Sequence, residues 1–154
     1  MKAAKFDYLQ PRALDEALRA LQPSAAATGI KAMGGSQSFG PMLNLRLTRP
    51  RQVVDISRLA PLRELRVDGQ TLRIGAAVTH AEIEDGVHEA LRGSMLQYVA
   101  GGIAYRAVRN RGTVGGSLAH ADPAADWVLA LTALAATLEL QSATGTRKLG
   151  MDDF

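Results

Sequence analysis

Two glycine-bearing segments constrain the fold of this chain more than any other feature. Gly34-Gly35-Ser36 follows the apolar run 30–33, and Gly115-Gly116-Ser117 precedes a segment that is expected to start a helix. Glycine lets the backbone approach a ligand or another segment closely, and it permits a positive φ. Successive N–H groups in such turns form a concave anion site, to which serine hydroxyls add donors. Two such turns suit a diphosphate, whereas each alone is more often structural.

Several site classes are excluded by what the sequence lacks. Neither glycine segment matches the P-loop or the dinucleotide fingerprint Gly-x-Gly-x-x-Gly. The absence of cysteine excludes disulfides, thiolate zinc sites and cysteine-ligated iron–sulfur clusters within the chain. We expect no membrane span, because no run of about 20 apolar residues occurs. Residues 1–7 lack the apolar core of a signal peptide, so we expect a cytoplasmic location.

The hydrophobic pattern predicts a chain that mixes helices and strands. We expect helices over 14–21, from Pro41, over 80–91 and over 95–100, strands over 30–33 and 53–56, a loop over 24–29, and hairpins over 65–74 and 137–149. Asp68-Gly69 marks the first hairpin. Thr79 and Glu82 fit a capping box. Asp122, with Pro123 at the first helical position, predicts one more helix start.

Charge is distributed unevenly along the chain. Residues 1–60 hold nine Lys and Arg against four Asp and Glu, whereas residues 61–154 hold nine against eleven. A basic N-terminal region attracts anions such as a nucleotide, a phosphate or nucleic acid, and a solvated surface is an equally simple interpretation. Aromatic residues make up only 5%, which argues against a stacking platform for single-stranded nucleic acid. The basic stretch 106–111 either lines an anion site, contacts a partner or is surface.

The titratable residues suggest few catalytic sites. His80 and His88 are eight apart on one expected helix without metal-ligand spacing, so a solvated helix surface is the favoured interpretation. Ser117, His120 and Asp122 invite a hydrolase triad, but they lie within six residues of one another and no Gly-x-Ser-x-Gly elbow is present. Asp126 is expected one turn into the last helix. Its carboxylate suits sugar hydroxyls, or it is simply a favourable acidic first turn.

Taken together, these segments resemble the FAD subunits of molybdenum hydroxylases, a family that includes carbon monoxide dehydrogenase medium chains and the flavin domain of xanthine dehydrogenase. The stretch 32–38, Ala-Met-Gly-Gly-Ser-Gln-Ser, resembles the family's first flavin-binding loop. The longer stretch 109–126 is similar to its second and more specific motif. Residues 74–79 and the opening 6–11 are also typical of the family. The resemblance covers nearly all of the 154 residues.

The resemblance implies an α+β, two-lobed FAD-binding domain of the vanillyl-alcohol-oxidase-like (PCMH) type. Residues 1–57 would form an N-terminal α/β lobe and residues 58–154 a second α+β lobe, with the FAD diphosphate between them. The residues that the resemblance assigns to the cofactor are Ala32, Met33, Gly34, Gly35, Ser36, Gln37, Ser38, Thr113, Gly115, Gly116, Ser117 and Asp126. Asp126 would contact ribityl or ribose hydroxyls. No catalytic residue and no metal ligand is implied in this chain.

The function implied by the resemblance is that of an oxidoreductase subunit that transfers electrons. In such complexes a large subunit holds molybdopterin, a small subunit holds iron–sulfur clusters, and FAD passes electrons to an external acceptor such as NAD, a quinone or oxygen. This chain departs from the family pattern at Ser117, where many relatives have asparagine, and family members continue with a further C-terminal lobe after Phe154. The main alternative is a truncated, non-catalytic assembly or interaction fragment that retains no flavin. A nucleic-acid binder is less favoured.

Overall fold

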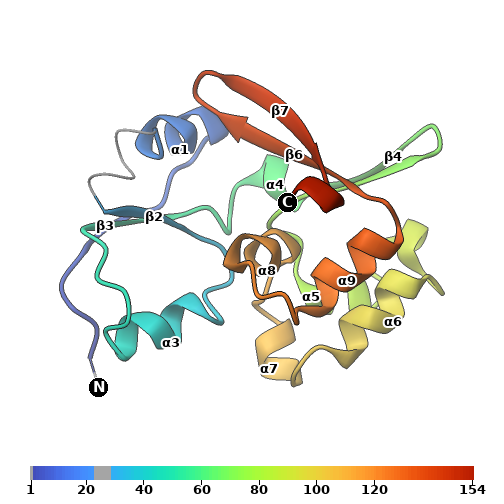
Figure 1. The fold of residues 1–154 in the computed structure, drawn as a ribbon, viewed down its shortest axis with the longest axis horizontal. Coiled ribbons are helices and arrows are strands. Elements are labelled where there is room, and N and C mark those ends of the chain that lie inside the picture. The colour runs from blue at the N-terminus through green and yellow to red at the C-terminus, as the bar shows by residue number, and fades with distance from the viewer. Residues whose placement is uncertain (1, 23–28) are drawn as a thin grey trace.

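A computed structural model describes residues 2–22 and 29–154 (Figure 1). The helices and strands are β1 (Asp7–Leu9), α1 (Leu14–Ala20), β2 (Ile30–Met33), α3 (Phe39–Asn44), β3 (Gln52–Asp55), α4 (Ala60–Arg63), β4 (Leu65–Asp68), β5 (Thr71–Ile74), α5 (His80–Glu84), α6 (Met95–Gly102), α7 (Arg106–Arg109), α8 (Val114–His120), α9 (Asp126–Ala133), β6 (Thr137–Ser142) and β7 (Gly145–Gly150). Two short 3-10 turns lie at Glu89–Leu91 and Met151–Asp153. The mixture of helices with three small sheets is the expected α+β fold.

The N-terminal part is built on a three-stranded parallel sheet in the order β1-β3-β2. Val53 and Val54 of the central strand β3 are fully buried. Val54 belongs to one hydrophobic cluster with Ala17 of α1 and Leu59. Because the three strands are parallel, their carboxyl ends meet at one edge of the sheet. The first glycine segment leaves the sheet at this edge, directly after β2.

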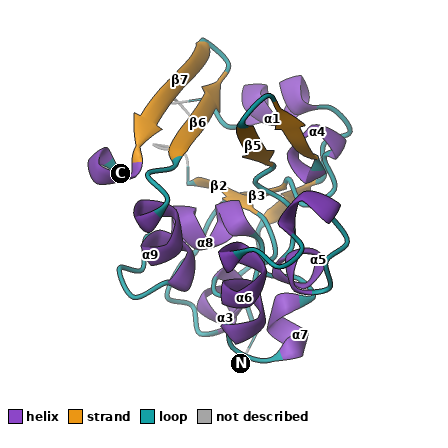
Figure 2. Cartoon of the chain, turned by 90° about the vertical axis from the view of Figure 1, so that its right-hand side faces the viewer, coloured by secondary structure: helices purple, strands orange, loops and turns teal. Residues whose placement is uncertain are grey.

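The second part is built mainly from helices (Figure 2). The fully buried Trp127 of α9 belongs to its hydrophobic cluster. Ile83 of α5, Leu96 of α6 and Leu118 of α8 belong to the same cluster. The antiparallel hairpins β4–β5 and β6–β7 complete this part. The proposed division of the chain at residues 57 and 58 stays a prediction. No helix within 2–22 and 29–154 is long and apolar enough to cross a membrane.

Local signals predicted several elements well. In the β4–β5 hairpin Asp68 pairs with Thr71, and Gly69 has a φ of 59°, which a residue other than glycine rarely adopts. The capping box is confirmed, since Thr79 and Glu82 exchange both hydrogen bonds at the start of α5. The C-terminal hairpin is also confirmed as β6–β7. Segment 7–9 is strand β1, which the hydrophobic pattern did not predict.

Four expected elements were wrong in extent. The helix expected over 80–91 ends at Glu84, since Gly86 turns the chain with a φ of 62°. The last helix starts at Asp126 rather than at Pro123, because the Asp122 carboxylate accepts the Ala124 N–H and forms a local turn instead. The helix expected from Pro41 starts at Phe39, and α6 continues through Gly102. The loop expected over 24–29 falls almost entirely outside the described residues.

Candidate functional site

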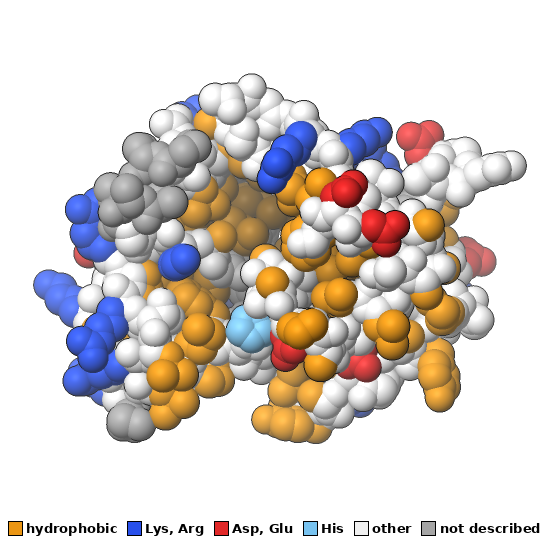
Figure 3. Space-filling view, in the orientation of Figure 1, with side chains coloured by type: hydrophobic (Ala, Val, Ile, Leu, Met, Phe, Trp, Pro, Cys, Tyr) orange, Lys and Arg blue, Asp and Glu red, His pale blue; other side chains and the backbone are white. Residues whose placement is uncertain are grey.

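The two glycine segments lie against one another in the structure, although they are far apart in the sequence. A Cβ atom on Gly35 would overlap the carbonyl oxygen of Arg111, and a Cβ on Gly34 would lie 2.9 Å from Thr113 Oγ1. Only glycine permits such a close approach of two backbones. The space-filling view shows the surface hollowed between the two parts of the molecule (Figure 3). Lys and Arg side chains gather over its left-hand, N-terminal side.

The first glycine segment is a loop whose backbone donors are unpaired. The N–H groups of residues 34–38 donate no hydrogen bond to any other described residue. Gly35 is buried, whereas Ser36 and Gln37 are half-buried and Ser38 is exposed. Ser36 has a positive φ of 62°, and turns that contain such a residue can direct successive N–H groups into an anion-binding concavity. Because no described residue accepts from them, these N–H groups are available to an external acceptor.

The second glycine segment was expected as a turn, but it is the first turn of α8. The N–H groups of Val114 and Gly115 donate to the carbonyls of Val78 and Ala76, at 3.1 and 2.9 Å. The Gly116 N–H donates to Thr113 Oγ1 at 3.1 Å, so Thr113 is the N-cap of the helix. These backbone donors are therefore already paired within the protein, which the sequence pattern did not reveal.

The packing of α8 explains why residue 115 is a glycine. A Cβ there would lie 2.5 Å from the Ala76 Cβ, so α8 can press against segment 76–78 only if this residue is glycine. Gly116 is exposed and Ser117 is half-buried. The Ser117 hydroxyl forms no hydrogen bond with another residue of the described chain. Thr113 is buried, and its Oγ1 lies beside Gly34 of the first loop.

Asp126 occupies a different place from the one expected. It is the first residue of α9, it is exposed, and its carboxylate accepts no side-chain hydrogen bond from the described residues. It lines a shallow, largely apolar groove between α6 and α9 with Tyr98 and Leu129. Its assigned contact with sugar hydroxyls therefore stays a prediction. Ala32 is exposed and Met33 half-buried at the end of β2.

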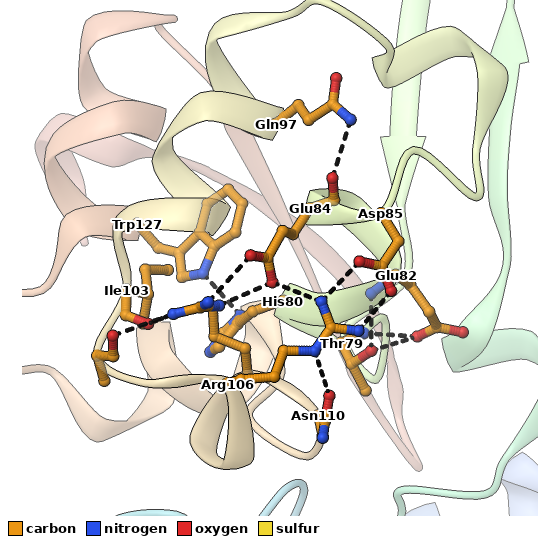
Figure 4. Close-up of polar contacts among 12 residues, drawn as sticks. Thr79, His80, Glu82, Glu84, Asp85, Gln97, Ile103, Arg106, Asn110 and Trp127 are labelled. Carbon is orange, nitrogen blue, oxygen red and sulfur yellow. Dashed lines mark hydrogen bonds and ion pairs between the residues drawn. The ribbon is translucent and has the colours of Figure 1, made fainter.

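Most arginines of the basic stretch before α8 form ion pairs and hydrogen bonds within the protein (Figure 4). Arg106 binds Asp85 with two hydrogen bonds of 2.6 Å. Arg109 Nε donates to Glu84 at 2.7 Å, and its Nη1 donates to the carbonyls of Ile103 and Ala104. The Arg109 hydrogen bond holds the pKa of the Glu84 carboxyl below its usual value. Arg111 forms no ion pair with any described residue, so it is the cation of this stretch left for a ligand or partner.

His80 is not a solvated helix residue, which corrects the expectation for it. It is 4% exposed, and its Nδ1 accepts the indole N–H of Trp127 at 2.9 Å. Burial, followed by the positive charge of Arg109, lowers the pKa of His80 to about 4. His88 lies outside α5. No hydrogen bond joins Ser117, His120 and Asp122 in the described chain, and no cluster of metal-ligating side chains occurs in the same ranges.

A polar cluster at the carboxyl edge of the parallel sheet was missed by sequence reasoning. The Tyr8 hydroxyl and the Gln10 amide donate to the buried Asp55 carboxylate, which also accepts the Ser57 N–H. Burial alone would raise the pKa of Asp55, but the hydrogen bonds from Tyr8 and Ser57 bring it below its usual value. The hydrogen bond to Asp55 raises the pKa of Tyr8. The cluster ties β1 to β3 beside the first loop.

Comparisons with known proteins place this arrangement in one family. A family model described as the FAD binding domain in molybdopterin dehydrogenase matches residues 4–154. The chain is 39% identical over 154 residues to the 6-hydroxypseudooxynicotine dehydrogenase complex subunit alpha of Paenarthrobacter nicotinovorans, covering all of this chain and 51% of that protein. It is 33% identical over 150 residues to the carbon monoxide dehydrogenase medium chain of Hydrogenophaga pseudoflava, covering 97% of this chain and 52% of that protein.

A solved structure confirms the fold. Quinoline 2-oxidoreductase from Pseudomonas putida 86 matches with a TM-score of 0.92 and 36% identity over all of this chain and 53% of that one. The chain spans about half the length of the curated relatives it matches. The α+β fold of the vanillyl-alcohol-oxidase-like type, expected from the resemblance, is therefore confirmed. The chain belongs to the family of FAD-binding domains found in molybdopterin dehydrogenases.

Proposed function

We propose that the loop Gly34–Ser38 binds the diphosphate of FAD. The observation that carries this proposal is the run of five consecutive N–H groups with no acceptor among the described residues. Backbone donors suit a diphosphate because they cost no side-chain ordering and hold partial positive charge in a fixed place. The residue types in this loop therefore fit the cofactor of the family.

The second motif completes the site by a different means. Its N–H groups are paired internally, so Thr113 and Ser117 would contribute hydroxyls while Gly115 and Gly116 keep side chains out of the way. Ala32 and Met33 would flank the entrance of the first loop, and Asp126 would accept hydrogen bonds from ribityl or ribose hydroxyls. Arg111, which has no ion pair in the described chain, adds positive charge beside the diphosphate.

Membership of this family supports a proposal for the biological role. We propose that the chain is the FAD-binding part of an electron-transfer subunit in a molybdenum hydroxylase complex. When bound, FAD supplies the redox chemistry that connects an iron–sulfur partner subunit to an external acceptor, and this chain binds and orients it. A molybdopterin-binding large subunit would hold the substrate. The relatives named as a complex subunit and a medium chain support this role.

A visible absorption spectrum tests the proposal. The protein is mixed with FAD, freed from excess ligand and examined for a retained flavin band. ADP added afterwards should displace the flavin, whereas adenosine at the same concentration should not, because adenosine has no diphosphate for the loop. Retained flavin that ADP does not displace would overturn the assignment of the loop. No retained flavin would favour the alternative of an assembly fragment.

A further inference from the structure

A buried imidazole–indole pair lies directly behind the second flavin motif. The Trp127 Nε1–H donates to His80 Nδ1 at 2.9 Å, and the two ring centroids are 5.8 Å apart (Figure 4). Trp127 is fully buried and His80 is 4% exposed. The pair joins α5 to α9, and Trp127 directly follows Asp126. Two residues assigned to the cofactor are thus adjacent to this pair: Asp126 precedes Trp127, and Thr113 pairs with Thr79, the residue before His80.

His80 supports the chain immediately before Thr113 in two ways. Its backbone N–H donates to the Gly112 carbonyl at 3.0 Å. Its ring lies so close to Gly112 that a Cβ atom there would be 2.7 Å from both Nε2 and Cδ2. Thr79, the preceding residue, forms a β-bridge with Thr113. The backbone and the ring of His80 therefore both lie against the segment that leads into α8.

The hydrogen bond fixes the protonation state of the ring. The indole N–H is only a donor, so Nδ1 must carry a lone pair and the proton must sit on Nε2. A protonated ring has donors at both nitrogens and cannot accept from Trp127. Two charges face this ring from its neighbours: Arg109 of α7 opposes protonation and Asp126 of α9 favours it, while burial opposes it most strongly.

We propose that His80 is a positioning residue that holds the second flavin-binding motif in place only while its imidazole is neutral and accepts the Trp127 indole N–H. The inference rests on the proposed FAD site. Its consequence is that FAD affinity depends on a hydrogen bond made by residues that do not touch the cofactor. Loss of this bond lets the Gly112 segment shift against Gly35, whose own position is fixed by close contact with the Arg111 carbonyl.

Binding of FAD at pH 7.5 tests the proposal with the wild type and four variants. Trp127→Phe keeps an aromatic ring but removes the donor, and it should weaken FAD binding about three- to ten-fold, the size expected for one lost hydrogen bond. His80→Leu, which removes the acceptor, should do the same. His80→Gln provides a neutral amide oxygen that accepts the indole N–H, so it should restore affinity to within about two-fold. Leu91→Ala, in the same hydrophobic cluster but in the 3-10 turn, is the stability control.

The outcomes separate the two proposals. If the wild-type protein binds no FAD, the proposed site fails. If the wild type binds and Trp127→Phe binds equally well, the site stands and the role of His80 is overturned. A loss of affinity in Leu91→Ala as large as in Trp127→Phe would also overturn it, because the effect would then reflect stability alone. Thermal unfolding followed by circular dichroism shows that each variant is folded at the temperature of the binding assay.

Indole fluorescence gives a second readout that needs no cofactor. Trp127 is the single tryptophan of the chain, so its emission reports on His80 directly. A neighbouring imidazolium quenches indole emission, and the wild-type signal should therefore fall in acid with a midpoint well below the pKa of an ordinary histidine. His80→Gln should show no such transition while the protein remains folded. An identical transition in wild type and His80→Gln would contradict the pairing.

Discussion

The two glycine segments contain the same three letters, Gly-Gly-Ser, yet the structure uses them differently. In the first, at 34–36, the backbone N–H groups have no partner among the described residues. In the second, at 115–117, the N–H groups are paired with Ala76 and Thr113. The first segment is thus a donor loop, and the second is a helix start that packs behind it.

The difference arises from what precedes each segment. The first leaves a parallel strand and turns through Ser36 with a positive φ, so successive N–H groups point away from the protein's own acceptors. The second begins a helix whose first turn is capped by Thr113 and pressed onto segment 76–78. A glycine pair therefore indicates close packing against the protein itself in both places, but only the conformation decides whether the backbone N–H groups stay available to a ligand.

The largest effect is expected from a substitution that introduces a steric clash between the two glycine segments. Gly35→Ala places a methyl group on the Arg111 carbonyl oxygen. Relief of this clash requires one of the two backbone segments to move, which costs free energy. We expect a loss of more than about 3 kcal/mol in the free energy of unfolding, beyond the usual range for overpacking, and loss of FAD binding. Chemical denaturation and a flavin titration measure the two.

Gly102→Ala is the matched control for this change. Gly102 ends α6, and a Cβ there meets no atom within 4 Å. The free energy of unfolding of this variant should differ from that of the wild type by less than about 1 kcal/mol, since alanine is the better helix former. If Gly35→Ala behaved like Gly102→Ala, the contact between the two segments would not be the one described.

The next largest effect is the pH dependence of stability that His80 contributes. Its pKa of about 4 in the folded protein lies below the ordinary histidine value of 6.5, so the folded state binds fewer protons than the unfolded state between these values. The contribution of His80 to the free energy of unfolding is fully present above about pH 6.5. It decreases as the pH falls towards 4, by up to about 3 kcal/mol in total. Denaturation midpoints from pH 8 to 4 should show a shallower acid loss in His80→Gln than in wild type. Equal slopes would contradict the assignment.

A smaller effect is expected at the ion pairs that hold α7. Arg109→Met removes the hydrogen bonds to Glu84 and to the carbonyls of Ile103 and Ala104, and we expect a loss of about 2 kcal/mol because these groups lose their partners. Arg73→Met breaks the more exposed pair with Glu139 and should cost less than about 1 kcal/mol. Thermal unfolding of both variants compares them. Equal losses would show that α7 is not anchored through Arg109.

The smallest effect concerns the cap of α8. Thr113→Val removes the Oγ1 acceptor of the Gly116 N–H while keeping the side-chain shape, and it should cost about 1 kcal/mol. Thr113→Ser keeps the acceptor and should lose less. If the two variants were equally stable in denaturant titrations, the hydroxyl would have no capping role.

Sequence patterns predicted most of what depends on local chemistry. The Asp68-Gly69 hairpin, the capping box at Thr79 and the strand before Gly34 all follow from short-range rules, and the resemblance gave the fold. The internal pairing of the Gly115 and Gly116 donors was not predictable, because their acceptors come from segment 76–78 and from a helix start.

Long-range partners explain the remaining errors. His80 was interpreted as solvated because its partner Trp127 lies on another helix that buries it. The interpretations of 106–111 did not include the ion pairs of Arg106 and Arg109 within the chain, because Glu84 and Asp85 come from α5. Asp122 was assigned the cap of a helix, but its carboxylate satisfies the nearer Ala124 N–H first.

The most direct test of the central claim places a charge in the donor loop without disturbing the fold. Ser38 is exposed and is the N-cap of α3, where Asp and Asn are both well tolerated. Ser38→Asp should weaken FAD binding at least roughly ten-fold through repulsion of the diphosphate, whereas the isosteric Ser38→Asn should stay within about three-fold of wild type. Equal FAD dissociation constants for the Asp and Asn variants would contradict the assignment of Gly34–Ser38 as the diphosphate site.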